Sequence, residues 1–294
     1  MPGDGERAQG QRPSDDGCNE RGAGSDGPAG DTEAEARDVE EHSRLKAPVI
    51  YEIVRREGEN EMERPTASLW WSGLAAGLSI SFSLLAEAIL QLHLPAAPWR
   101  PLVAGFGYSF GFLVVVLGRQ QLFTENTVTV VLPVAAELTW ANMRRLLRMW
   151  AIVFFANTAG TLFAAIFCSF APVIDTDLRS AMFEISRQMM ENGPVAMFFK
   201  AISAGFLIAA MVWLIPSAEG TQFHVVTVVT YLIAIGGFVH IVAGSVEAFM
   251  LVVTGQLGFG QMLVGFTIPA LCGNVIGGTA LFALISYAQV MHEI

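Results

Sequence analysis

The chain has 294 residues, of which 53% are apolar and only 15% are charged, and its mean hydropathy is +0.48. This balance is unusual for a soluble domain and predicts an all-α membrane protein embedded in a lipid bilayer. The formal charge of −10 arises largely in the first 46 residues, so it says little about a ligand. No basic patch interleaved with aromatic residues is present, which speaks against nucleic acid as a partner.

The composition changes along the chain and divides it into three regions. Residues 1–48 are acidic and poor in large apolar side chains, and we expect a disordered cytoplasmic tail. Residues 49–66 can place Ile50, Ile53 and Val54 on one helical face, which predicts an amphipathic helix on the membrane surface, with a soluble linker helix as the alternative. Residues 67–294 are predicted to form a six-span transmembrane domain.

A membrane crossing takes about 20 largely apolar residues. Six segments meet this requirement, namely 67–92, 101–134, 147–170, 195–215, 225–254 and 260–290. A polar, acidic connection at 175–192 separates the third from the fourth. The three cysteines show no metal-ligand spacing, and neither a metal nor a cofactor is predicted.

The second segment is too long for one straight crossing and is polar in its middle. Arg119, Gln120 and Gln121 stand there, followed by Glu125 and Asn126. Charged and amide groups at membrane depth are costly, and irregular backbone is tolerated there only where protein or a water-filled cavity surrounds it. We therefore expect two half-helices joined by a loop, an arrangement that indicates a transport pathway.

The fifth segment has a comparable interruption. Gly236 and Gly237 come first, and His240, Ser245 and Glu247 follow within a few residues. This pattern predicts a second broken helix, and it places one imidazole and one carboxylate at or near the break.

A repeat relates the third and sixth segments. Asn157 and Gly160 lie in the third, and Asn274, Gly277 and Gly278 lie in the sixth, so both combine an asparagine with small residues that let helices pack closely. Each follows a broken segment. We therefore expect two halves of three spans each, inverted relative to one another, with the broken helices 2 and 5 facing each other.

Arginines are distributed unevenly between the two sides of the predicted bundle. Six lie on the side of the N-terminus and three on the opposite side: 55, 56, 64, 144, 145 and 148 against 100, 179 and 187. This bias places both termini in the cytoplasm.

Three motifs together resemble the formate/nitrite transporter family. They are Leu122-Phe123-Thr124 in the break of span two, Gly237-Phe238-Val239-His240 in the break of span five, and 273–278 in span six. The resemblance covers about residue 51 to the C-terminus, and the run 119–128 is similar to the YfdC-like branch of the bacterial inner membrane. It implies an aquaporin-like fold in a homopentamer, with each protomer carrying a pore for small monovalent anions, as a channel or a proton-coupled carrier.

The resemblance also implies roles for particular residues. Thr124 is expected to face His240 at the centre of the pathway, beside Leu122 and Phe123. Apolar constrictions are expected on either side of this centre, formed by Tyr108 and Phe112 on one side and Ile233 on the other.

The sequence departs from the family pattern at three places. Gly205 stands where the family has an asparagine in span four, and Met189 stands near the place of a family lysine, with Arg187 close by. Glu125 follows the Leu-Phe-Thr motif where the family has a small residue. A carboxylate beside the pathway would repel an anion, which weakens the expectation of formate or nitrite and leaves the fold unaffected.

His240 is the central candidate for chemistry. An anion entering an apolar constriction loses its hydration at a large cost, and a neutral imidazole can donate an N–H group to it or lend it a proton. Thr124 would orient the imidazole or the solute through its hydroxyl. The alternative is a hydrogen-bonded structural histidine at a helix break.

The carboxylates near the breaks allow two interpretations. Glu125 and Glu247 can line the pore, or each can accept hydrogen bonds from free N–H groups at a half-helix N-terminus. We expect Arg119 to pair with Glu125, because pairing is the cheapest way to keep both charges at membrane depth. Glu87 is expected at a vestibule or protomer interface, and Lys200 is expected to extend to the membrane interface.

Other functions remain open at this point. The carboxylates also suit a pore for a neutral or cationic solute, and a non-conducting membrane protein of envelope stress is a further alternative. An aquaporin proper is disfavoured, since no Asn-Pro-Ala pair occurs at either break. Ser245 and His240 could meet as in an intramembrane hydrolase, but no nucleophile elbow or orienting acid accompanies them, and we do not expect an enzyme.

Overall fold

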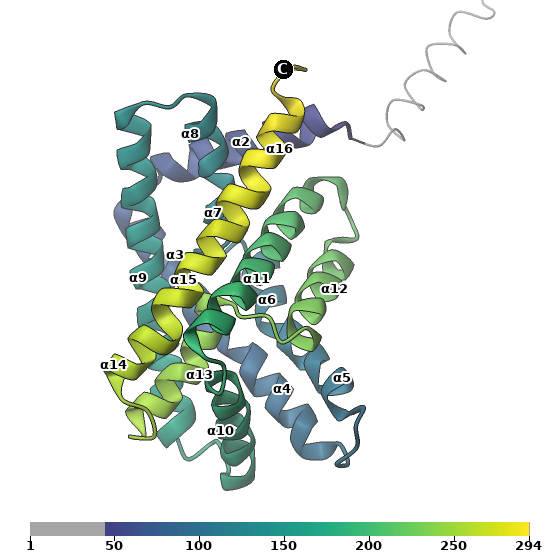
Figure 1. Ribbon diagram of the computed structural model, residues 1–294, viewed down its shortest axis with the longest axis vertical. Coiled ribbons are helices and arrows are strands. Elements are labelled where there is room, and N and C mark those ends of the chain that lie inside the picture. Colours follow the sequence, from purple (N-terminus) through teal and green to yellow (C-terminus); the bar gives the residue numbers. More distant parts are fainter. Residues whose placement is uncertain (1–44, 294) are drawn as a thin grey trace, which may run out of the picture. The chain divides into compact units, whose positions relative to one another are not determined.

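The computed structural model describes residues 45–293 of the chain, and that part is helical throughout apart from its loops (Figure 1). The expected tail at 1–48 lies almost entirely outside the described residues. In chain order the helices are α2 (Ala47–Glu63), α3 (Thr66–Ser79), α4 (Ser81–His93), α5 (Arg100–Ala104), η1 (Gly105–Tyr108), α6 (Ser109–Leu117), α7 (Asn126–Thr129), α8 (Val131–Ala136), α9 (Trp140–Phe170), α10 (Thr176–Met190), α11 (Pro194–Leu214), η2 (Ile215–Ser217), α12 (Gln222–Ile235), α13 (Ile241–Val253), α14 (Phe259–Met262), η3 (Leu263–Thr267), α15 (Ile268–Val275), η4 (Ile276–Ala283) and α16 (Leu284–Val290).

The described residues contain five helical stretches that are long and apolar enough to cross a membrane: Thr66–His93, Arg100–Leu117, Trp140–Phe170, Pro194–Ser217 and Phe259–Val290. The remaining crossing is made by two short apolar helices, α12 and α13, and the second crossing is continued by α7 and α8. Spans two and five are therefore broken, as predicted, at 118–125 and 236–240.

One boundary and one connection differ from the sequence prediction. Span three begins at Trp140, because Thr139 caps the helix by accepting a hydrogen bond from Asn142 N–H. The connection at 175–192 contains a helix, α10, capped by Asp175, which accepts a hydrogen bond of 2.8 Å from Leu178 N–H. This helix packs against α4 and α13, so tertiary contacts stabilise a segment too polar to be recognised as part of the bundle.

The two halves of the bundle are built alike. In the first half α3 packs along α9, and in the second α11 packs along α15 and η4. Gly77 and Gly160 allow the first approach, since a Cβ atom on either would collide with the backbone of the other helix. Gly277 does the same in the second half, where a Cβ would collide with the Ile202 carbonyl. The small residues of the repeat thus pack helices, as predicted.

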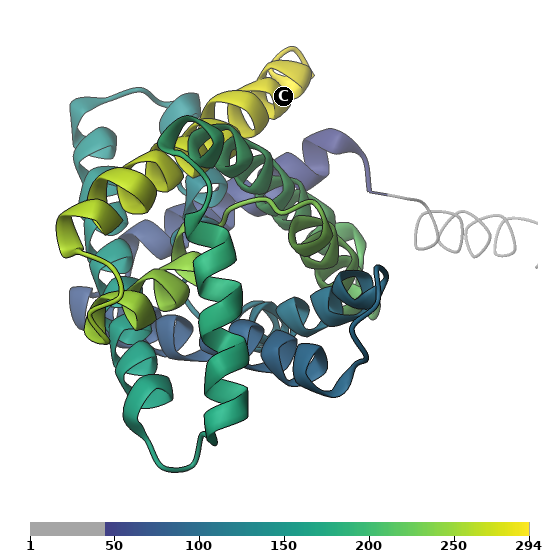
Figure 2. The same ribbon diagram turned by 60° about the horizontal axis from the view of Figure 1, so that its bottom comes forward.

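Helix α2 lies against the end of the bundle that also carries α8 and α16 (Figure 1). Its buried residues are Tyr51, Val54, Gly58 and Met62, whereas Ile53 is 40% exposed. The amphipathic helix is therefore present, but its buried face is rotated from the predicted one and packs on protein. The opposite end of the bundle carries α10, which comes forward in Figure 2.

Candidate functional site

The two breaks meet inside the bundle. The Thr124 hydroxyl oxygen lies 2.6 Å from Nε2 of His240, and the two residues are 0% and 1% exposed. Thr124 is held by the loop between α6 and α7, and His240 by the loop between α12 and α13. The contact expected from the family resemblance is thus formed by residues 116 positions apart.

His240 is also the N-cap of α13. Its Nδ1 atom accepts a hydrogen bond of 3.1 Å from Ala243 N–H, so the ring proton must sit on Nε2 and be donated to Thr124. The imidazole is then neutral, and the hydroxyl proton of Thr124 is free to be donated to something else. The structural interpretation of His240 therefore holds alongside the functional one.

Aromatic rings surround one side of this contact. Phe112 lies edge-on to the imidazole with ring centroids 5.0 Å apart, and Tyr108 lies 5.2 Å from Phe112. Phe112 is completely buried, while Tyr108 faces a cavity. The two aromatic residues predicted for a constriction thus lie against one another, and Phe112 contacts the ring of His240.

Two asparagines hold the breaks in place with the same set of hydrogen bonds. Asn157 of α9 accepts from Phe123 N–H and donates to the carbonyls of Gln121 and Gly73, at 2.7 to 2.9 Å. Irregular backbone inside a membrane needs such partners, because no water is available to pair with it.

Asn274 of α15 repeats this arrangement in the second half. It accepts from Ile241 N–H and donates to the carbonyls of Val239 and Ala201, again at 2.7 to 2.9 Å. The asparagines that the sequence assigned to helix packing therefore clamp the two breaks to spans one and four.

A cavity of about 220 Å³, here called the α10-side cavity, borders His240 on one side. It is lined by residues of α4, η1, α10, α11, α12 and α13 and of the span-five break. Its ionisable side chains are Glu87, Tyr108, Lys200, His240 and Glu247. Lys200 donates a hydrogen bond of 2.7 Å to the side chain of Asn192, in the connection before α11, and its extension to the membrane interface stays a prediction. In the sequence, the feature that points to a role for Lys200 is its charge within an otherwise apolar span.

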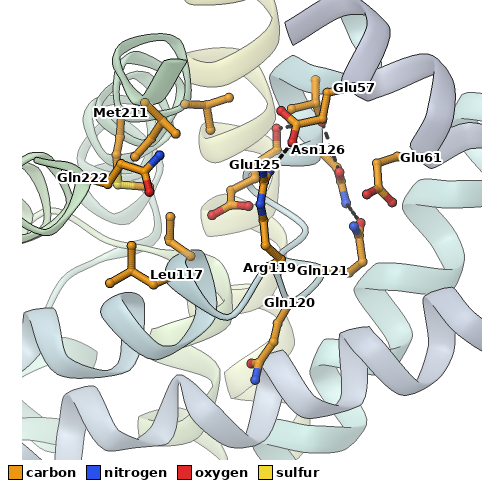
Figure 3. A pocket seen from close by; sticks show the side chains of 14 residues that line it. Glu57, Glu61, Leu117, Arg119, Gln120, Gln121, Glu125, Asn126, Met211 and Gln222 are labelled. Atoms are coloured by element: carbon orange, nitrogen blue, oxygen red, sulfur yellow. Dashed lines mark hydrogen bonds and ion pairs between the residues drawn. The ribbon is translucent and has the colours of Figure 1, made fainter. Parts of the chain in front are cut away.

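A second cavity of about 120 Å³, the α2-side cavity, lies at the span-two break beneath α2 (Figure 3). Its charged side chains are Glu57, Glu61, Arg119 and Glu125. Arg119 pairs with Glu57 of α2, and its side chain is 79% exposed. The predicted pair of Arg119 with Glu125 is therefore wrong, because the left-handed backbone of Arg119 directs its side chain to the surface helix.

Glu125 and Glu247 do not cap their half-helices. Glu125 is the N-cap of α7, yet its side chain makes no capping hydrogen bond and its Oε1 atom is buried without a partner. Glu247 lies two turns into α13, is 8% exposed, and has no hydrogen bond or ion pair to the described residues. Both carboxylates face cavities, so the capping interpretation is wrong for both.

Three other predicted residues occupy different surroundings. Phe123 packs against Trp150 and Phe154, with ring centroids 5.8 and 5.3 Å away, and its side chain faces an apolar groove apart from the two cavities. Its assignment to the pathway therefore stays a prediction. Leu122 and Ile233 are completely buried and line neither cavity, so their role in a constriction stays a prediction.

The close contacts of three glycines show how the helices pack around the two breaks. A Cβ on Gly205 would collide with the Asn274 carbonyl, so this position packs helices and cannot hold a pathway asparagine. A Cβ on Gly278 would collide with the Thr127 hydroxyl oxygen, which brings span six against the span-two break. Gly244 lies against Phe266 and Met189.

Ser245 and His240 do not form a nucleophile and base. The Ser245 hydroxyl donates a hydrogen bond of 2.6 Å to the Ile241 carbonyl, which is an intrahelical bond. Both imidazole nitrogens are engaged by Ala243 and Thr124. The described residues thus offer no support for the hydrolase alternative.

Two broken helices that meet between two polar cavities define a multi-span membrane channel or transporter. The formate/nitrite transporter family model matches residues 48–288, and the chain belongs to this family. It is 44% identical to the inner membrane protein YfdC of Escherichia coli K12, over 84% of this chain and 80% of that protein. It is 26% identical to the formate channel FocA of Haemophilus influenzae, over 74% and 84% of the two chains.

Solved structures share the fold. A pentameric formate channel with formate bound superposes with a TM-score of 0.66 at 19% identity, covering 77% of this chain and 98% of its own. An ion channel of the same family superposes equally well, covering 83% and 96%. The aquaporin-like architecture predicted from the family resemblance is therefore confirmed.

Proposed function

We propose that this protein carries small monovalent anions of weak acids, such as formate or nitrite, across the membrane together with a proton. The observation that supports this most is the contact between Thr124 and His240, buried between two polar cavities. Since His240 Nε2–H is donated to Thr124, the threonine hydroxyl can donate to a solute that has left water. Lys200 in the α10-side cavity supplies a positive charge that draws an anion toward it.

A second candidate is a pathway for a neutral or cationic solute. Glu125 and Glu247 favour it, because each carboxylate faces a cavity without a cation or hydrogen-bond partner within the described chain. A permeating anion would be repelled by either carboxylate in its ionised form.

We propose a homopentamer in a bacterial inner membrane with both termini in the cytoplasm. The relatives' assemblies and membrane support the first two points, and the arginine bias supports the third, since it puts the α2 end of the bundle inside. Each protomer has its own pair of cavities. Exposed aromatic side chains of the spans, including Trp71, Phe155 and Phe163, suit contact with lipid or a neighbouring protomer.

The test is flux of formate, nitrite and a neutral solute into liposomes that contain the purified protein. His240→Asn removes the bond to Thr124 but keeps a good N-cap residue, whereas His240→Ala removes both. We expect both variants to lose anion flux by about 5- to 150-fold, the effect of about 1–3 kcal/mol for an unpaired polar group. Thr124→Val should behave likewise, and Thr124→Ser should retain flux.

Thermal unfolding separates the cap from the pathway. His240→Asn should unfold near the parent temperature, while His240→Ala should lose about 1 kcal/mol. Parent-level anion flux in His240→Asn would remove the imidazole from the mechanism. Flux of the neutral solute without any anion flux in the parent would favour the second candidate.

A further inference from the structure

The α10-side cavity contains a carboxylate that the anion pathway does not require. Glu247 is 92% buried, as its exposed fraction is 8%, and its side chain has no hydrogen bond and no ion pair to the described residues. Its oxygen atoms are not among the fully enclosed polar atoms without a partner, so they reach the cavity space. A buried polar group in this state indicates something that binds to it from the cavity.

A lone buried carboxylate needs a cation or a proton to neutralise it. The only basic side chain on the wall of this cavity, as far as the structure describes it, is Lys200, which donates to the amide oxygen of Asn192. The other ionisable groups on the wall are Glu87 from α4, Tyr108 from η1 and His240 from the span-five break. Helix α10 contributes only uncharged side chains: Ile185, Gln188 and Met189.

His240 is poorly placed to serve as the proton carrier. A proton added to the ring would go to Nδ1, which already accepts from Ala243 N–H, so protonation would break the cap of α13. Protonation of Glu247 or Glu87 breaks no hydrogen bond to the described residues. Tyr108, which is 8% exposed, adds a hydroxyl without a hydrogen-bond partner in residues 45–293 at the same cavity.

We propose that Glu247, assisted by Glu87, is the proton-loading site of the α10-side cavity and protonates the weak-acid anion before it passes His240. The anion is drawn in by Lys200, and the O–H bond of the Glu247 carboxylic acid breaks as an O–H bond to the anion forms. The neutral acid moves on through the apolar constriction, and the Glu247 carboxylate takes a new proton from water in the cavity. Charge and protons balance in each step.

This inference rests on the proposed function and gives the carboxylates a role in it. An ionised carboxylate repels anions, but a protonated one donates a hydrogen bond and a proton. The presence of these carboxylates is therefore consistent with an anion as the transported solute. The neutral acid crosses the dry region without the desolvation cost of the free anion.

The experiment compares formate flux at several external pH values in liposomes that contain the full-length protein, with an entrapped pH indicator. The variants are Glu247→Gln, Glu87→Gln and Glu247→Asp. Glu184→Gln is the matched control, because Glu184 is an exposed carboxylate of α10 that does not line the cavity.

In the parent we expect one proton to enter with each formate and flux to fall about tenfold per unit rise in pH above the loading range, as for one required proton. Glu247→Gln should flatten this dependence to less than about twofold per unit and make the flux respond to membrane potential, since the anion then moves without its proton. The pH dependence of flux in Glu247→Asp and Glu184→Gln should resemble that of the parent. In Glu87→Gln it should lie between those of the parent and Glu247→Gln.

The outcomes distinguish the two proposals. Proton-coupled formate flux that is unchanged in Glu247→Gln overturns this inference and leaves the proposed function standing. Absence of formate and nitrite flux in the parent at every pH overturns both. Flux that depends on sodium or ammonium ions rather than on protons would make the carboxylates a cation site, which also overturns the inference. Size-exclusion profiles of all variants confirm that they are folded.

Discussion

Arg119 and Gly237 occupy equivalent positions where the helices α6 and α12 end at the two breaks, and both have left-handed backbone, with φ of +53° and +58°. The hydrogen bonds around them match. Gln120 N–H bonds to the Val115 carbonyl, and Phe238 N–H bonds to the Ile233 carbonyl, each at 3.0 Å. The inverted repeat therefore extends to the conformation of single residues.

This equivalence predicts how both sites respond to substitution. A left-handed conformation costs a non-glycine residue about 1–2 kcal/mol, whereas the exposed pair of Arg119 with Glu57 contributes less than about 1 kcal/mol. We expect Arg119→Gly to unfold at a higher temperature than Arg119→Ala, and Gly237→Ala to destabilise the protein by about 1 kcal/mol although space for a Cβ exists there. Alanine variants as stable as the glycine forms would contradict this.

The two clamping asparagines should be indispensable for folding. Asn274→Ala leaves Ile241 N–H and two carbonyl groups buried without partners, at about 1–3 kcal/mol for each group. We expect a loss of several kcal/mol, seen as a large drop in thermal midpoint or as aggregation in detergent, and the same for Asn157→Ala. The control is Asn142→Ala, where the side chain bonds at the surface to the Glu137 carbonyl. Parent-like stability of both clamp variants would show that the breaks are held by other contacts.

Substitutions of Gly205 test whether this position packs two helices together or lines the pathway. Its Cα lies against the backbone of Asn274, so Gly205→Ala should overpack spans four and six and cost about 1–3 kcal/mol. Gly205→Asn, the residue type that the family resemblance implies, should give no folded protein. Gly260→Ala is the control, because a Cβ there meets no atom within 4 Å. A folded Gly205→Asn variant with altered flux would return this position to the pathway.

Surface charges on α2 predict a specific acid response. Hydrogen bonds from Arg55 and Arg56 lower the pKa of Glu52 from 4.5 to about 2. A lowered pKa means that this carboxylate stabilises the folded protein above about pH 4.5 and that the contribution is lost as pH falls toward 2.

The measurement is the difference in thermal midpoint between the parent and Glu52→Gln. It should be largest near neutral pH and shrink as pH falls from about 4.5 to about 2. Glu63→Gln changes an exposed carboxylate of the same helix and serves as the control. A difference that is constant over this range would show that the arginine pairs do not act on folding.

The position of the breaks was predictable, but the side-chain partners within them were not. Polar residues inside apolar runs revealed both interruptions, since any charge at membrane depth is costly. Arg119 was assigned to Glu125 because both lie in one short segment. The pairing with Glu57 depends on a left-handed residue and on the placement of α2, and neither can be inferred from local sequence.

Composition and periodicity by themselves determined the membrane class, the number of crossings and the inverted halves, because the bilayer imposes length and polarity limits on every span. The pairing of Thr124 with His240 was implied by the resemblance of the sequence motifs to a known family. Only the tertiary structure decided which side chains share a cavity. Lys200, Glu87 and Glu247 come from three different helices, and Phe123, one residue from Thr124, lines an apolar groove apart from that cavity. Such neighbourhoods arise from how helices pack in space, and helix packing joins residues that are distant in the chain.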